Sequence, residues 1–160
     1  VVGTSGVMRE IVAAGTAAGH KLKETMDNGD LAPSWVAVYA YLKTLFAIPD
    51  DGTVIFDGTS RTPTEAEVVA DSLRWLGRPF RIFHLTVPDE EVHGRIALRR
   101  EKGSRPDDHP EAVATRLKAY YESTDGAISY LRDQGLLTDI DGHRPIDVIA
   151  AEVRSILNLQ

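Results

Sequence analysis

An arginine that follows a short strand-and-turn segment is the strongest chemical signal in this sequence. The apolar run Val54–Phe56 predicts a buried strand, and Asp57-Gly58 predicts a turn directly after it. Arg61 comes next, just before a helix start marked by Thr62-Pro63. Strand, glycine turn, basic side chain and helix N-terminus together favour an anion at the carboxyl edge of an open α/β sheet. An ordinary surface loop with an exposed arginine is the alternative.

More arginines stand against an acidic background, since the chain has 18 Lys and Arg against 24 Asp and Glu. Arg95 and Arg99 are four residues apart on an expected helix, so they share a face and repel each other unless exposed or around an anion. Guanidinium groups suit phosphate recognition and neutralise charge during phosphoryl transfer. The alternative is a set of solvated arginines with local carboxylate partners. The candidates are Arg9, Arg61, Arg95, Arg99, Arg105 and Arg116.

The elements that must position these arginines alternate between strands and helices. This order predicts a three-layer α/β fold with a parallel sheet in a single domain over residues 1–160. We expect strands near 1–3, 54–56, 80–87 and 136–140, and helices over 7–14, 16–27, 34–46, 62–76, 88–100, 110–134 and 146–156. Large apolar side chains on these helices are expected to face the core, among them Trp35, Tyr39, Phe46, Tyr120, Tyr121, Tyr130 and Ile146.

Composition excludes several classes of function. Hydrophobic residues make up 42% and charged residues 26%, as in a soluble globular protein. A net charge of −6 argues against a general nucleic-acid surface. The lack of cysteine excludes disulfides and thiolate metal sites, and the five histidines show no metal-ligand spacing. No apolar run has the length of a membrane span. We therefore expect a cytoplasmic protein with no nucleic-acid or membrane partner.

Taken in order, segments of the chain resemble the adenylate kinase family of nucleoside-monophosphate kinases. TSGVMR, AAGT and GHKLKETMDNGDLAPS resemble the family's monophosphate-binding region, and FDGTSRT resembles its strand-end segment. VPDEEVHGRIALRR and SRPDD resemble the segments that enter and leave the family's lid, and LLTDIDGHRPIDVI resembles its last strand and helix. The similarity of each segment alone is modest, but the segments follow the family's order and spacing from about Thr4 to the C-terminus, and this ordered set is specific to the family.

The resemblance implies a monomeric phosphotransferase that uses ATP with Mg²⁺ and a nucleoside monophosphate, most simply ATP and AMP giving two ADP. It implies a monophosphate-binding part over about 4–33 and a minimal lid over about 99–105. The implied nucleotide-binding residues are Thr4, Arg9, Asp30, Leu31, Ala32, Gly58, Thr59, Ser60, Arg61, Glu65 and Arg144. The implied catalytic residues around the transferred phosphate are Arg95, Arg99, Arg105 and Arg116, and Asp57 would orient water on magnesium.

Three positions depart from the family pattern. Thr4-Ser5-Gly6 replaces Thr-Gly-Asp, and Thr59-Ser60 replaces Phe-Pro before the arginine. Glu65 replaces the glutamine that reads the edge of adenine. A carboxylate accepts from an exocyclic amine but, unless protonated, cannot donate to a ring nitrogen. The preferred base is therefore left open between adenine and guanine. The lid is short, and the absence of cysteine excludes a zinc-binding lid.

The phosphate loop GxxxxGK(S/T) does not occur in the sequence. In the resembled family this loop follows a first strand that lies inside the sheet. We expect that strand and loop to be absent from this chain, the complete protein to carry them, and this chain alone to be impaired. The alternatives are a catalytically degenerate nucleotide-binding module and an inactive N-terminally truncated fragment.

Overall fold

The computed structural model describes residues 2–101 and 110–159. The first half contains β1 (Val2–Gly3), α1 (Thr4–Ala13), α2 (Ala17–Asp27), α3 (Ser34–Leu45), β2 (Phe56–Asp57) and α4 (Pro63–Trp75). The second half contains β3 (Ile82–Thr86), α5 (Asp89–Glu101), α6 (Pro110–Ala119), a π-helical turn η1 (Tyr120–Thr124), α7 (Asp125–Asp133), β4 (Leu137–Asp141) and α8 (Ile146–Ile156). The expected alternation of strands and helices is confirmed.

The strands pair in parallel, as expected, but the described residues form two sheets rather than one. β1 pairs with β2 over two positions, from Val2 opposite Phe56 to Gly3 opposite Asp57. β3 pairs with β4 over five positions, from Ile82 opposite Leu137 to Thr86 opposite Asp141. The strand expected over 54–56 is therefore correct only at Phe56, because β1 offers partners to two residues alone. Among the described residues, β2 and β3 each pair along one edge.

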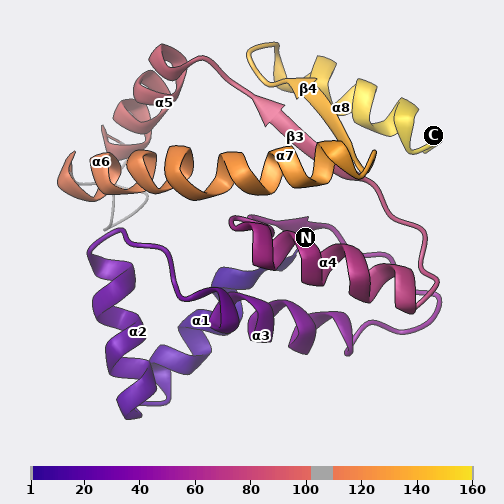
Figure 1. Ribbon diagram of the computed structural model, residues 1–160. Coiled ribbons are helices and arrows are strands. Elements are labelled where there is room, and N and C mark those ends of the chain that lie inside the picture. Colours follow the sequence, from indigo (N-terminus) through magenta and orange to yellow (C-terminus); the bar gives the residue numbers. More distant parts are fainter. Residues whose placement is uncertain (1, 102–109, 160) are drawn as a thin grey trace.

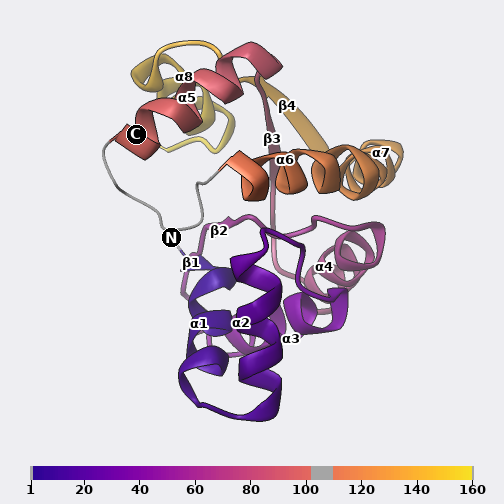
Figure 2. The same cartoon turned by 90° about the vertical axis from the view of Figure 1, so that its left-hand side faces the viewer.

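One long helix divides the molecule. α6, η1 and α7 run as a continuous rod, with β1, β2 and α1–α4 on one side and β3, β4, α5 and α8 on the other (Figure 1). The view turned by 90° shows the same division, with α4 beneath the rod (Figure 2). α4 packs against α3 on one flank and against α7 on another. The helix that follows Arg61 is thus the link between the two sides.

The core consists of two clusters that meet on α4. In the first, Tyr41 and Leu45 of α3 pack on Val69 of α4, and the Tyr41 and Phe56 ring centroids lie 5.0 Å apart. In the second, Ala66 of α4 packs with Ala127 and Leu131 of α7. The side chains around this second cluster come from both strands of the second sheet, from α7 and from the link between α7 and β4: Ile82, Tyr130, Leu136 and Leu137. Both clusters together fix the position of the α4 N-terminus.

Several side chains that we expected in the core are exposed. They are Trp35, Tyr39, Phe46, Tyr120, Tyr121 and Ile146, with Trp35 72% and Ile146 86% exposed. α3 is apolar on nearly all sides, so its periodicity does not single out one buried face. Tyr120 and Tyr121 carry hydroxyls that bond at the surface, the first with His84 and the second with Asp89. In the part of the chain that the structure describes, no helix is both long and apolar enough to cross a bilayer.

A charged group on the second sheet ties the strands to the rod. The Asp139 carboxylate accepts from Nδ1 of His84, its neighbour on β3, at 2.8 Å and from Arg132 of α7 at 3.0 Å. The hydrogen bond from His84, followed by that from Arg132, lowers the pKa of Asp139 below its ordinary value. Because the folded state has the lower pKa, this stabilisation is present above the unfolded pKa and is lost as the pH falls through the folded pKa.

Asp139→Asn is therefore expected to reduce stability in a pH-dependent way. The Asp139 and Arg132 side chains are solvent-exposed, so the free energy of unfolding near pH 6 should fall by no more than about 1 kcal/mol. Near pH 3 and below the difference should shrink, because the unfolded carboxylate, with an ordinary pKa of about 3.9, is then mostly protonated. Urea unfolding at both pH values measures this. Asp133→Asn is the matched control, since Asp133 is exposed on α7 and has no ion pair among the described contacts. An equal loss at both pH values would contradict the prediction.

Candidate functional site

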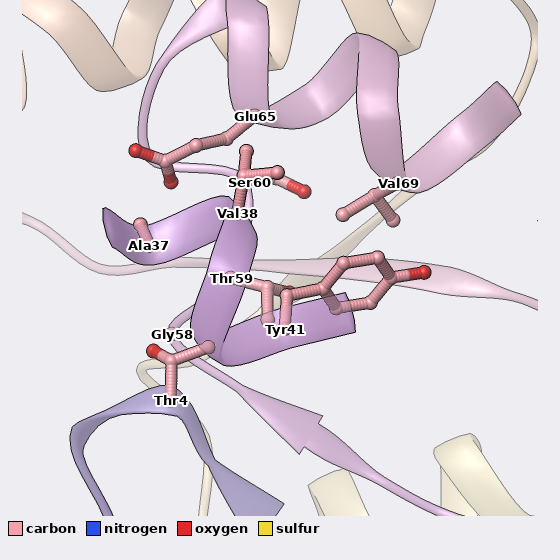
Figure 3. A pocket seen from close by; sticks show the side chains of 9 residues that line it. All are labelled: Thr4, Ala37, Val38, Tyr41, Gly58, Thr59, Ser60, Glu65 and Val69. Carbon is pink, nitrogen blue, oxygen red and sulfur yellow. The ribbon is translucent and has the colours of Figure 1, made fainter. Parts of the chain in front are cut away.

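A small pocket brings together several of the predicted nucleotide-binding residues. Its volume is about 10 Å³, enough for roughly one water molecule. α1 contributes Thr4, the turn after β2 contributes Gly58, Thr59 and Ser60, and α4 contributes Glu65 (Figure 3). The remaining wall is mostly apolar, formed by Ala37, Val38, Tyr41 and Val69. In this conformation a nucleotide could contact the rim of the pocket but could not enter it.

The turn after β2 folds the Arg61 side chain back onto Gly58, a residue of the pocket lining. Gly58 and Ser60 both have left-handed backbone angles, with φ of 71° and 60°. Glycine suits position 58 because of this backbone angle, and a Cβ atom there would also lie 2.9 Å from a guanidinium nitrogen of Arg61, which would have to shift. Nε of Arg61 donates to the Gly58 carbonyl at 3.2 Å. For Ser60, which has a side chain, such angles cost about 1–3 kcal/mol, as is common at functional sites.

The N-terminus of α4 is capped from both directions. The Thr62 hydroxyl accepts from the backbone N–H of Glu65 at 3.3 Å, and the Glu65 carboxylate accepts from the backbone N–H of Arg61 at 2.8 Å. The Ser34 hydroxyl lies 3.0 Å from that of Thr62 and so connects α3 to the cap. The helix dipole places partial positive charge at this end, beside the guanidinium group. The arrangement suits a phosphate at the rim.

Glu65 thus has a role that the sequence analysis missed. Its side chain is only 6% exposed, and the described hydrogen bond of its carboxylate goes to the protein backbone rather than into open solvent. The signal was present in the sequence, because Thr62 and Glu65 have the T-x-x-E spacing of a capping box. A base-reading role for Glu65 remains a prediction, and the carboxylate must serve it while holding the Arg61 amide.

The other residues predicted to bind the monophosphate lie outside this pocket lining. Arg9 is exposed on α1. The link between α2 and α3 carries Asp30, which is exposed, and Leu31 and Ala32, which are half-buried. The backbone N–H of Asp30 donates to the Thr25 carbonyl at 3.1 Å. The binding roles of these residues stay predictions, since no described contact brings them to Arg61.

Two predicted arginines meet at the turn after β4. Arg95 donates from Nη2 to the Gly142 carbonyl at 2.9 Å and from Nε to Glu91 at 2.8 Å. Arg144 donates from Nε to the Asp141 carbonyl at 3.2 Å, and its guanidinium group also pairs with Glu152 of α8. Both side chains therefore hold α5 and α8 to this turn in the present conformation.

The remaining catalytic candidates are described only in part. Arg99 is half-buried on α5. Arg116 lies on α6, with a side chain outside the described part of the structure, and Arg105 lies outside the described residues altogether. The gathering of the arginines around one phosphate group therefore stays a prediction.

A magnesium role for Asp57 is compatible with its position. Asp57 is the last residue of β2 and is exposed at the carboxyl end of that strand. Over residues 2–101 and 110–159 no group of three or more His, Asp or Glu side chains is placed to hold a metal ion. Mg²⁺ keeps several waters and is usually bound through substrate phosphates with one or two carboxylates. A lone carboxylate that acts through water fits this chemistry.

Comparison with known proteins identifies the family of this chain. The family model described as "Adenylate kinase" matches residues 1–136. An adenylate kinase of Cyanothece sp. is 31% identical over 158 residues, which cover 98% of this chain and 81% of the relative. An adenylate kinase of Archaeoglobus fulgidus is 32% identical over 98% of this chain and 85% of its own length. The adenylate kinase of Thermus thermophilus is 33% identical, with 98% and 82% covered. Since the family model spans most of the chain and these relatives match along nearly all of it, the protein belongs to the adenylate kinase family.

Proposed function

We propose that the protein transfers a phosphate group between ATP and AMP to give two ADP. One observation carries the proposal. At the start of α4 the Arg61 side chain bonds to Gly58, which lines the pocket together with Thr4. Relatives that match along nearly the whole chain are named adenylate kinase. An exposed guanidinium beside a helix N-terminus favours the doubly charged phosphate of a nucleoside monophosphate.

The proposed mechanism is an in-line transfer without a covalent intermediate. Such a transfer relies on positioning and on neutralising the charge that the phosphate group carries. Arg9 and Arg61 hold the AMP phosphate, and residues 4–33 form the monophosphate-binding part. Asp57 would orient a water molecule on the Mg²⁺ that enters with ATP, and the ion would supply positive charge to the transferred phosphate group. The transferred phosphate is surrounded by Arg95, Arg99, Arg105 and Arg116, with 99–105 as a minimal lid.

This mechanism requires Arg95 to change partners. In the described structure its guanidinium group is occupied by Glu91 and the Gly142 carbonyl. A phosphate is a stronger acceptor than a backbone carbonyl because the bond is charge-assisted on both sides. The proposal therefore includes a movement of the Arg95 side chain when ATP binds.

We also propose that transfer uses a strand and phosphate loop between β2 and β3. Parallel sheets are normally buried and continuous, and the unpaired edges of β2 and β3 each offer backbone groups to a further strand. A strand placed there would join the two sheets into one, in the three-layer form that the sequence analysis expects. A glycine loop after that strand would supply the backbone N–H groups that hold the ATP phosphates.

ADP formation tests the proposed function. The chain is extended at its N-terminus by a strand–GxxxxGK(S/T)–helix segment and supplied with ATP, Mg²⁺ and AMP, GMP or CMP. We expect ADP from AMP with the extended chain and much slower turnover with the 160-residue chain. The control is the extended chain with the loop lysine replaced by alanine.

Four outcomes would change the proposal. No ADP from any monophosphate with the extended chain would overturn phosphate transfer. AMP binding without transfer would identify a nucleotide-binding module instead. Equal turnover by the 160-residue chain would overturn the role of the additional strand and loop alone. Product formed from GMP rather than AMP would show that Glu65 changes the base preference.

A further inference from the structure

We propose that Thr124 is a positioning residue for Arg61 and holds the Arg61 backbone through a hydrogen bond from a distant part of the sequence. The inference rests on the proposed function, in which Arg61 binds the AMP phosphate. The Thr124 hydroxyl donates to the backbone carbonyl of Arg61 at 3.2 Å, although the two residues are 63 positions apart in the sequence. Arg61 follows β2, whereas Thr124 belongs to η1, so the bond joins the turn to the long rod.

Together with two local bonds, this contact holds Arg61 at three points. The backbone N–H donates to Glu65 at 2.8 Å, and Nε donates to the Gly58 carbonyl at 3.2 Å. Thr124 supplies the donor to the backbone carbonyl. An exposed arginine is otherwise free to sample many rotamers, and ordering it on ligand binding costs free energy. Fixing the backbone on both sides of the Cα atom lowers that cost.

The π-helical turn determines that Thr124 faces Arg61. In η1 the backbone N–H of Asp125 donates to the Tyr120 carbonyl, five residues back instead of four. The additional residue in the turn changes the phase of the rod by about 100° relative to an unbroken α-helix. π-helical turns are frequent at functional sites, and here the turn ends on the residue that bonds to Arg61.

The rod is anchored immediately beside this contact. Gly126 lies so close to Pro63 that a Cβ atom there would be 3.2 Å from the proline Cγ. Directly after it, Ala127 packs with Ala66 of α4, and so does Leu131 one turn further on. The first turn of α4 and the start of α7 are therefore packed together on the C-terminal side of the Thr124 bond, which restricts the geometry of that bond. Figure 1 shows the rod running alongside α4.

Calorimetry of AMP binding to the 160-residue chain tests the inference without requiring phosphate transfer. Thr124→Val keeps the shape and removes the hydroxyl, and we expect it to weaken AMP binding about 3- to 10-fold. Thr124→Ser keeps the donor and should bind AMP within about 2-fold of the unaltered chain. Thr115→Val is the matched control, because the described hydrogen bond of the Thr115 hydroxyl stays within α6, to the Glu111 carbonyl at 3.0 Å. It should leave binding unchanged.

A double-mutant cycle separates positioning from a general loss of stability. If Thr124 acts through Arg61, Thr124→Val should have no further effect on AMP binding in the Arg61→Ala background. Urea unfolding of each variant checks that it is folded, and Thr124→Ala replaces a valine variant that does not fold. Unchanged binding in Thr124→Val, or an equal loss in both backgrounds, would overturn this inference alone. No AMP binding by the unaltered chain would overturn this inference, and the proposed function would fall with it only if the extended chain also forms no ADP.

Discussion

Arg61→Ala is expected to weaken AMP binding by about 1.5–3 kcal/mol, which corresponds to roughly 10- to 150-fold in Kd. The physical reason is the loss of a charge-assisted hydrogen bond to the phosphate at the start of α4. Arg61→Lys should retain part of the affinity, since an ammonium group keeps the charge but lacks the planar fork. Isothermal calorimetry with AMP measures both variants.

The matched control for this change is Arg81→Ala. Arg81 is exposed, and its described hydrogen bond goes to the neighbouring Phe80 carbonyl at 3.1 Å. Its removal alters the net charge by the same amount as removal of Arg61, but far from the pocket lining. Equal affinities of the unaltered chain and Arg61→Ala would remove Arg61 from the site. Equal losses in the two variants would show a general electrostatic effect instead of a phosphate contact.

Leu131→Ala is expected to lower the free energy of unfolding by about 2–5 kcal/mol. Leu131 is 2% exposed and packs in the cluster that joins α7 to α4 and to the second sheet. Truncation removes buried methyl groups and leaves a cavity that helices packed through small alanines cannot readily close. Urea unfolding measures the change. Ile146→Ala is the control at an 86% exposed position and should change stability by less than about 0.5 kcal/mol. Similar losses in both variants would contradict the assigned core.

Local signals predicted the helices well because caps act over one turn. Thr16 was expected to begin a helix, and its hydroxyl caps α2 by accepting from the Gly19 N–H at 3.2 Å. Thr62-Pro63 marked the start of α4 in the same way. These residues need no distant partner, so the sequence contains the information required to place them.

Features that depend on distant partners were not predictable from the sequence. The strand expected over 54–56 is reduced to Phe56 at its end, because strand formation depends on which neighbour is present. The π-helical turn changes which side of the rod faces inward, so Tyr120 and Tyr121 lie outside although the helical periodicity places them inside. Ile146 follows a periodic apolar pattern, yet no described element covers it.

The candidate site shows the same division between local and distant information. The turn residues Gly58, Ser60 and Arg61 were identified from their types and order; Gly58 and Ser60 line one pocket, and the Arg61 side chain bonds to Gly58. The contact from Thr124 was not predictable, because it depends on how the rod lies across the start of α4. The sequence also could not show that Arg95 is engaged by the Gly142 carbonyl.

α4 contributes Val69 to one core cluster and Ala66 to the other. The two clusters therefore share this helix and do not fold independently of it. Any ligand that favours the ordered start of α4 adds its binding free energy to the folding of both clusters at once. In this member of the family, bound nucleotide would therefore stabilise the folded state of both clusters, and the folded fraction would rise with the nucleotide concentration.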